Sequence, residues 1–267
     1  MGLIKPHGPS WAYCSHNISG TPAVTTIGTQ FTPGAANADG TAVSVLSALT
    51  HDVEYLRLRF AGQTLTVETD NTALVSILID PAGGTSWAPL IPSLLVATAA
   101  MSASAPAMVS FDFPLWIPAG ASIGIQARSA AAAAPPVMRV TAEARGGNSN
   151  PASWWCGQRI TAIGIDAANS RGTTHTPGNT GAFSAWANFG STLEADCGAL
   201  QWAVSGGFGA TSWSQVFYEM QFGIASAMIG APVMHSVTSG EQAWTTPIGP
   251  IFKSLPSGTQ FMVRGTG

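Results

Sequence analysis

Short runs in which hydrophobic and polar residues alternate recur along this chain of 267 residues. Leu56, Leu58 and Phe60 alternate with Arg57 and Arg59, and a period of two is typical of a strand with one exposed face. Further hydrophobic runs bounded by Gly, Pro, Asn or Asp predict strands over 64–68, 74–79, 108–113, 122–127, 137–144, 160–165, 200–204, 213–222 and 260–264. The pattern therefore predicts a chain built from many short strands.

Helix signals are weak everywhere in the sequence. No segment combines a capping residue with an amphipathic period of 3.6, and only the Ser- and Ala-rich stretch 93–104 could carry a short helical turn. Many short strands separated by Gly- and Pro-rich turns favour a sandwich, because two sheets can bury their hydrophobic faces against each other.

One turn-like phrase occurs twice. GTQFTPG at 28–34 returns as GTTHTPG at 172–178, and a shift of 144 residues aligns 28–62 with 172–206 without a gap, with 11 identities in 35 positions. With small gaps, WIPAGASIGIQA at 116–127 also matches SLPSGTQFMVRG at 254–265. A period this long is the size of a whole domain, far beyond a solenoid repeat. The chain is therefore expected to be a duplication.

The duplication sets the expected fold class and domain organisation. We expect an all-β protein of two tandem, jelly-roll-like β-sandwich domains, residues 1–147 and 148–267, joined near the Gly- and Asn-rich stretch 146–152. The first copy continues into the alternating strand 137–144, and the second copy lacks a match to it. We expect this to leave an unpaired sheet edge in the second domain.

Three alternatives are open for that edge. A strand from a neighbouring subunit could close it by β-strand addition. The N-terminal arm of another copy, residues 1–9, could lie there instead. A shorter set of strands could also suffice for the second domain.

Charge is scarce: only 9% of residues are charged, with ten Lys and Arg, a net charge of −3 and no basic cluster. This excludes nucleic acid as a partner, because phosphates require clustered cations. A neutral surface is typical of a chain that contacts other proteins, the alternative being an unusually large core. The long uncharged run 81–111 contains several prolines and serines, so no membrane insertion is expected. The start has no hydrophobic signal region, which predicts synthesis in the cytoplasm.

Candidate chemistry is sparse as well. His51, Asp52 and Glu54 stand close together, but only the aspartate recurs in the second copy, as Asp196. An aspartate repeated at the start of a strand is typically a hydrogen-bond acceptor for a turn. The three cysteines form neither a disulfide framework nor a zinc motif, and no nucleophile or phosphate-binding motif occurs. We expect no enzymatic activity, no cofactor and no metal.

Nine tryptophans raise the possibility of aromatic contacts with a partner or a glycan. Trp11 and Trp154 occupy equivalent places in the two copies, which favours a role in the two cores. The candidates for contacts at a surface are the unmatched ones, Trp87, Trp116, Trp155, Trp186, Trp213 and Trp244. The alternative is that they fill the core or a subunit interface.

Duplicated sandwiches rich in Gly, Ala, Ser and Thr, with WIPAG and LPSG turns, resemble the virion proteins of tailed bacteriophages. The resemblance implies a structural protein made in the host cytoplasm and built into the particle as a tail, fibre or baseplate component, or as a capsid decoration or head fibre. Its partners would be other virion proteins and further copies of itself. A glycan- or receptor-binding module that contacts the host surface is the alternative from a different class.

Overall fold

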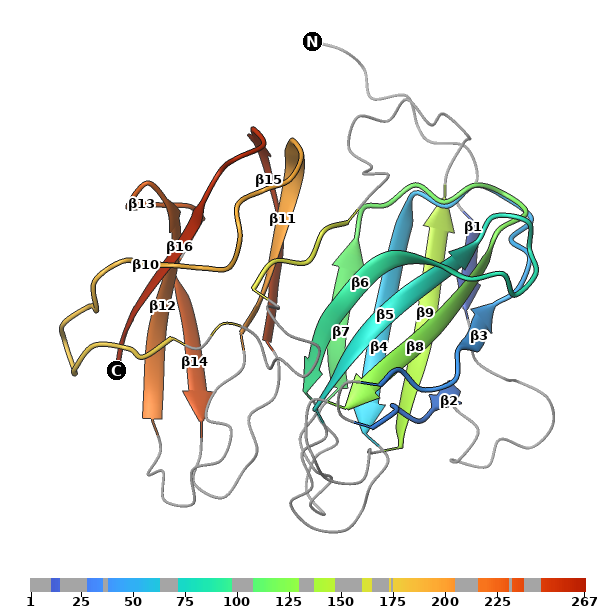
Figure 1. Ribbon diagram of the computed structural model, residues 1–267, viewed down its shortest axis with the longest axis horizontal. Helices are drawn as coiled ribbons and strands as arrows, with labels where there is room; N and C mark the ends of the chain where they lie inside the picture. Colours follow the sequence, from blue (N-terminus) through green and yellow to red (C-terminus); the bar gives the residue numbers. More distant parts are fainter. Residues whose placement is uncertain are drawn as a thin grey trace.

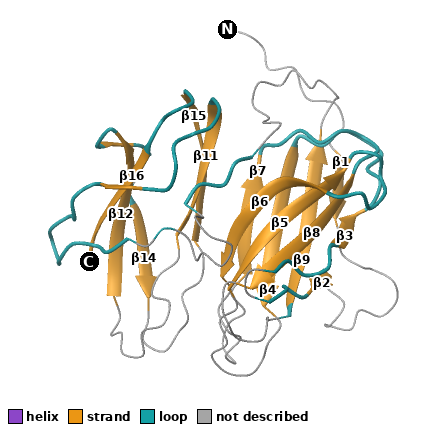
Figure 2. Cartoon of the chain, viewed as in Figure 1, coloured by secondary structure: helices purple, strands orange, loops and turns teal. Residues whose placement is uncertain are grey.

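The computed structural model describes residues 11–14, 28–35, 38–62, 72–97, 108–129, 137–146, 160–164, 173, 175–204, 216–230, 232–237 and 246–267. Every element of regular structure in these ranges is a β-strand (Figure 2). The strands form two separate sandwiches along the chain (Figure 1). The expected fold class, tandem duplicated β-sandwiches of the jelly-roll type, is confirmed.

The first sandwich has two facing antiparallel sheets. One runs in the order β1 (Trp11–Cys14), β9 (Met138–Gly146), β4 (Tyr55–Gly62) and β7 (Met108–Phe113), with β2 (Thr29–Phe31) also paired to β9. The other runs β3 (Val43–Leu46), β8 (Ser122–Ser129), β5 (Thr72–Asp80) and β6 (Ala88–Ala97). Two facing antiparallel sheets of five and four strands, with most connections crossing from one sheet to the other, form a jelly-roll-like arrangement.

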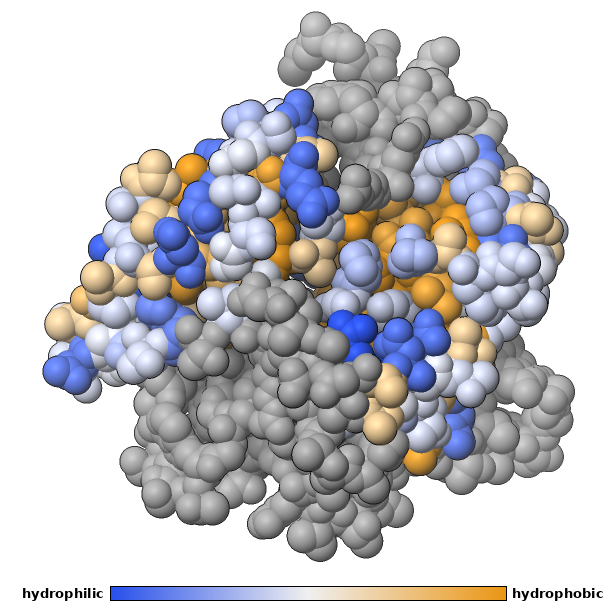
Figure 3. All heavy atoms as spheres, in the orientation of Figure 1, coloured by the Kyte–Doolittle hydropathy of each residue, from blue (hydrophilic) through white to orange (hydrophobic). Residues whose placement is uncertain are grey.

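Alternation along the strands builds the core of this sandwich. In β9 every second side chain is buried, and the intervening ones face outward. Phe60 lies at the centre, edge-to-face with Phe31 at 6.3 Å and with Phe111 at 6.1 Å between ring centres. Figure 3 shows that hydrophobic residues also reach the surface over β5 and β6.

The second sandwich repeats this arrangement with fewer strands. One sheet contains β10 (Ala187–Asn188), β16 (Phe261–Thr266), β12 (Val216–Ile224) and then β13 (Ala227–Met228), with β14 (Val233–Val237) also paired to β12. The other contains β11 (Cys197–Val204) and β15 (Thr246–Leu255). In its core, Trp202 stacks on Phe222 at 4.2 Å and meets Phe261 edge-on at 5.2 Å. The two sandwiches touch where β15 contacts β7.

The repeated TPG phrase performs the same task in both copies. The amide of Gly34 donates to the carbonyl of Ala127 at 2.9 Å, and the amide of Gly178 donates to the carbonyl of Gly265 at 2.8 Å. A Cβ at either glycine would overlap the carbonyl oxygen four residues later. Glycine is therefore required at both positions, because the backbone turns back on itself there.

The repeated aspartate also performs the same task twice. Asp52 accepts a hydrogen bond from the amide of Ala119 at 2.7 Å, and Asp196 accepts one from Ser257 at 2.9 Å. Each aspartate thereby holds a Pro-x-Gly turn, whose glycine has a φ of +88° in the first copy and +78° in the second. The prediction that this aspartate is an acceptor for a turn is confirmed.

One expected strand, 160–165, was wrong over the residues that are described, and the helical turn considered in 93–104 is absent from its described part, 93–97. Residues 160–164 form no strand, because no described strand offers them backbone hydrogen bonds. The stretch 93–97 lies in β6 instead of a helical turn, and the irregular feature there is Ser93, whose φ of +52° marks a bulge. The predicted strand 64–68, the arm 1–9 and residues 147–159 lie outside the described residues, so the domain boundaries stay a prediction.

The sheet of two strands differs most from its counterpart. In the first sandwich β4 lies between β7 and β9, with Leu56 opposite Phe113 on the β7 side. In the second sandwich Leu200 of β11 lies opposite Ile251 of β15 in the equivalent register. No strand within the described ranges pairs with the other side of β11, which is the side that β9 covers on β4.

We expect Gly34→Ala and Gly178→Ala each to lower the free energy of unfolding by about 1–3 kcal/mol, because the new methyl group meets backbone that cannot move aside. Chemical denaturation measures the effect. Gly198→Ala is the control, since a Cβ at Gly198 has no atom within 4 Å. Equal stability of all three variants would contradict the duplicated contact.

Candidate functional site

The outward face of the β10–β16–β12 sheet carries an aromatic and cationic surface. The guanidinium carbon of Arg264 lies 4.6 Å from the ring centre of Trp186 and 4.8 Å from that of Phe183. The Arg264 side chain is half-buried, and Phe183 is 37% exposed. We call Phe183, Trp186, Gln221 and Arg264 the Arg264 surface.

A glycine in the sheet allows this surface to form. Trp186 lies directly against Gly223 of β12, where a Cβ would come within 2.8 Å of the indole ring. Any other residue at position 223 would push the indole away from the strand. The indole of Trp186 can therefore pack directly on the sheet, because Gly223 has no side chain beneath it.

Hydrogen bonds hold Arg264 in place from the other side. Its Nε donates to Oε1 of Gln221 at 2.8 Å, and Nε2 of Gln221 donates to Oε1 of Glu219 at 3.1 Å. Gln221 is only 8% exposed. The amide thus separates Glu219 from the guanidinium, and no ion pair joins the two among the described residues.

The six tryptophans predicted to make surface contacts lie in different environments. Trp186 belongs to the Arg264 surface, and Trp87 lies on the outward face of the first sandwich against Gly124. Trp116 is half-buried, and its indole nitrogen is buried without a hydrogen-bond partner among the described residues. Trp155, Trp213 and Trp244 lie outside the described residues.

Sequence reasoning missed Phe183, Gln221 and Arg264. The alignment of the two copies places Asp39 opposite Phe183 and Gln126 opposite Arg264. The only sign of this surface in the sequence is that Asp39 of the first copy is replaced by the aromatic Phe183 in the second. The proximity of these side chains depends on strand register, because Arg264 lies opposite Gln221 only through the pairing of β16 with β12.

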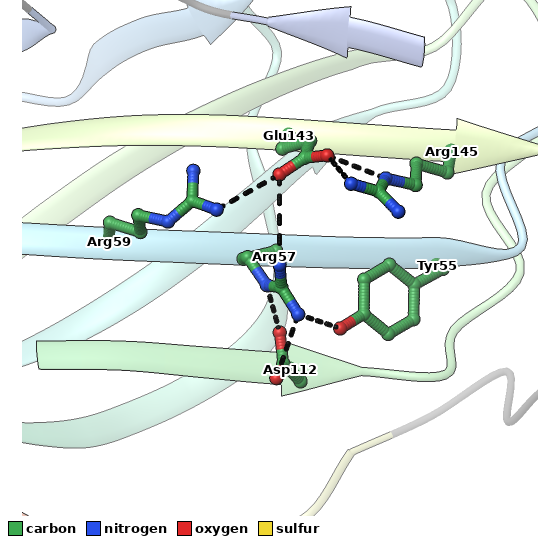
Figure 4. A network of polar contacts seen from close by, with 6 residues as sticks. All are labelled: Tyr55, Arg57, Arg59, Asp112, Glu143 and Arg145. Carbon is green, nitrogen blue, oxygen red and sulfur yellow. Dashed lines mark hydrogen bonds and ion pairs between the residues drawn. The ribbon is translucent and has the colours of Figure 1, made fainter. Parts of the chain in front are cut away.

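The first sandwich carries a polar network on the outward face of β7, β4 and β9 (Figure 4). Nε of Arg57 donates to Oδ1 of Asp112 at 2.6 Å, and Nη2 of Arg59 donates to Oε2 of Glu143 at 3.2 Å. Arg145 donates to the same glutamate. Arg57 and Arg59 of β4 are bound to carboxylates on the neighbouring strands β7 and β9, and Arg145 is bound to Glu143 on its own strand, which ties the sheet together and leaves little capacity for a ligand.

This network changes the acidity of its carboxylates. Burial raises the pKa of Asp112, but hydrogen bonds from Arg57 and Tyr55 and the charge of Arg57 lower it by more, so the net pKa is below its ordinary value. The pKa of Glu143 is also lowered, first by its hydrogen bond with Arg145.

The two sandwiches differ in how their outer edges are protected. Strand β6, an edge of the first sandwich, contains Pro89, Pro92 and the bulge at Ser93, which are features that block pairing with another chain. The equivalent edge of the second sandwich, β13 and β14, is interrupted between the strands by Gly230, whose φ is +74°, and by Pro232, although neither strand itself contains a proline. It exposes Met228 by 47% and Met234 by 73%.

The remaining candidates for chemistry have structural contacts. His51 lies 2.8 Å from the hydroxyl of Thr50, and burial lowers the pKa of His175, which is paired with Ser184 at 3.0 Å. Burial raises the pKa of the Cys197 thiol. Within the described ranges, no three His, Cys, Asp or Glu side chains come together as a metal site. The described part of the chain also contains no helix long and hydrophobic enough to cross a membrane.

No protein-family model and no curated protein matches the chain. Among solved structures, it is similar to the N-terminal CBM22-1–CBM22-2 tandem domain of Xyn10C from Paenibacillus barcinonensis, with 11% identity and a TM-score of 0.27 over 97% of this chain and 84% of that one.

We expect Asp112→Asn to lower the free energy of unfolding at pH 7 by about 1 kcal/mol, because a half-buried ion pair is lost. A carboxylate whose pKa is lowered on folding contributes stability above its unfolded pKa, and this stability is lost as the pH falls through the lower folded pKa. The variant should therefore lose less stability than the wild type between about pH 5 and pH 2.

Urea titrations at several pH values measure this difference. Asp39→Asn is the matched control, because Asp39 is 43% exposed and pairs with Arg128 at 3.4 Å, so its effect should be smaller. Parallel pH profiles for the wild type and Asp112→Asn would show that the network contributes nothing.

Proposed function

We propose that this chain is a non-enzymatic structural protein of a tailed-bacteriophage particle, a tail, fibre or baseplate component that assembles with neighbouring subunits. The observation that carries the proposal is the exposed hydrophobic edge of the second sandwich. Met228 and Met234 are two of the four large hydrophobic residues exposed in the described part of the chain, and both lie on this edge. Exposed hydrophobic strands favour association with another chain.

The contrast within the chain strengthens this interpretation. The first sandwich blocks its equivalent edge with two prolines and a bulge, so the same fold can protect that edge. Methionine at a surface is suited to protein contacts, because its flexible thioether adapts to different partners. The second sandwich is therefore the part that we expect to meet neighbouring subunits.

The side of β11 that pairs with no described strand is a second place where association is expected. In the first sandwich the equivalent side of β4 is covered by β9, which makes an antiparallel ladder along all of β4. A strand of a neighbouring virion protein could add to β11 in the same way. A capsid decoration or head fibre would use the same edges with a different neighbour.

We infer no enzymatic activity. Asp52, the aspartate that a catalytic site here would need, already holds a turn. Oδ1 of Asp52 accepts a hydrogen bond from the Ala119 amide, and the equivalent Asp196 does the same. His51 beside it contacts the hydroxyl of Thr50, and the equivalent position in the second copy is Ala195, so the histidine does not recur.

We expect the purified chain to form homo-oligomers, and Met234→Lys to shift them towards the monomer, because a charged residue on an edge strand opposes pairing. Light scattering coupled to size-exclusion chromatography measures the mass. Ser44→Lys is the control, since it adds the same charge at an exposed strand position of the first sandwich. A monomeric wild type, or equal masses for Met234→Lys and the wild type, would contradict the proposed edge.

The virion assignment has its own test. Co-expression with the products of neighbouring genes should yield a complex that sediments faster than the chain alone, because particle proteins assemble on one another. Unchanged sedimentation in every combination would contradict a role in a particle.

A further inference from the structure

Arg264 differs from four of the five described arginines of the first sandwich in the partner that balances its charge; the fifth, Arg139, donates to the side-chain oxygen of Gln30 and to the Gly28 carbonyl. Arg57, Arg59, Arg128 and Arg145 each form an ion pair with a carboxylate. Arg264 instead has two aromatic rings and the amide oxygen of Gln221. Within the described ranges no carboxylate pairs with it, so its positive charge is balanced by no neighbouring anion there.

The hydrogen bond to Gln221 decides which part of the guanidinium is available. It occupies Nε, and no acceptor among the described residues is bound to the two terminal nitrogens. These nitrogens form a planar fork whose spacing matches the two oxygens of a carboxylate. The structure therefore presents a cation that is oriented for end-on binding of a carboxylate group.

Hydrophobic area lies directly beside the fork. Phe183 is 37% exposed and its ring centre is 4.8 Å from the guanidinium carbon. An exposed aromatic ring packs well against the C–H face of a pyranose ring. A sugar with a carboxylate on its ring would fill both parts of the surface at once.

The surface is also held in place before any ligand binds. Trp186 is seated on Gly223, and the buried Gln221 fixes the guanidinium at Nε. Little side-chain entropy is then lost on binding, which favours a small rigid ligand over a flexible acidic peptide. Glu219 is the nearest acidic group on the paired strand, and the Gln221 amide occupies it.

We propose that the Arg264 surface binds an acidic saccharide, with the carboxylate of a uronic or sialic acid residue on the terminal nitrogens of Arg264 and the sugar ring against Phe183. This site goes beyond the assembly function proposed above and uses a different face of the second sandwich. An assembly protein that carries it would also contact a surface rich in acidic glycans.

Isothermal titration calorimetry with trigalacturonate, its neutral methyl ester and 3′-sialyllactose tests the proposal. The wild type should bind trigalacturonate or 3′-sialyllactose. If it binds trigalacturonate, it should bind this acid more tightly than the neutral methyl ester. Arg264→Gln should weaken acid binding by about tenfold or more, because two charge-assisted hydrogen bonds are lost. Arg264→Lys should recover only part of the affinity, since it keeps the charge without the fork.

Two further variants separate the surface from the fold. Phe183→Ala should weaken saccharide binding. Thermal unfolding should show that the second sandwich stays folded in this variant, because the Phe183 ring is exposed. Trp87→Ala is the matched control, because Trp87 also lies against a glycine on an outward sheet face. This variant should bind the saccharides as tightly as the wild type does.

Four results would overturn the proposal. They are absence of binding to both acidic saccharides, equal affinity for trigalacturonate and its ester, unchanged affinity in Arg264→Gln, or tighter binding of a poly-glutamate peptide than of either saccharide. The last result would identify an acidic peptide as the ligand instead.

Discussion

Burial of two hydrophobic sheet faces against each other is the constraint on which the structure depends. A strand in these sandwiches places every second side chain inward, so each sheet has one face that must be covered. In the first copy Phe60 and Phe111 fill the space between the sheets, and in the second copy Trp202 and Phe222 do so. With a chain this poor in charge, ion pairs add little to this burial, and among the described residues most of them lie in the network of Figure 4.

Packing two sheets together buries their hydrophobic faces but does not pair the backbone groups of their edge strands. The backbone groups of an edge strand stay available for pairing, and the two copies treat them differently. Pro89 and Pro92 remove donors from the edge of the first copy, whereas Met228 and Met234 leave the second copy hydrophobic at that place. The same fold thus has two edges of different chemistry in the two copies.

Outward faces are free to diverge once the inward faces are packed. The first copy uses its outward face for arginines paired with carboxylates across three strands. The second copy uses a different outward face for Arg264 between aromatic rings. Duplication allows such divergence, because a substitution on an outward face changes the surface chemistry at little cost to the core.

The sequence alone determined the duplication, the all-β class and the task of Asp52 and Asp196, because alternation and turn chemistry act over a few neighbouring residues. Residues 160–164 show the limit of this reasoning, since a hydrophobic run becomes a strand only beside a partner. Only the tertiary structure brought Phe183, Trp186, Gln221 and Arg264 together. These residues come from separate segments, and their proximity depends on which strands pair and in which register, a matter of non-local packing that no local pattern records.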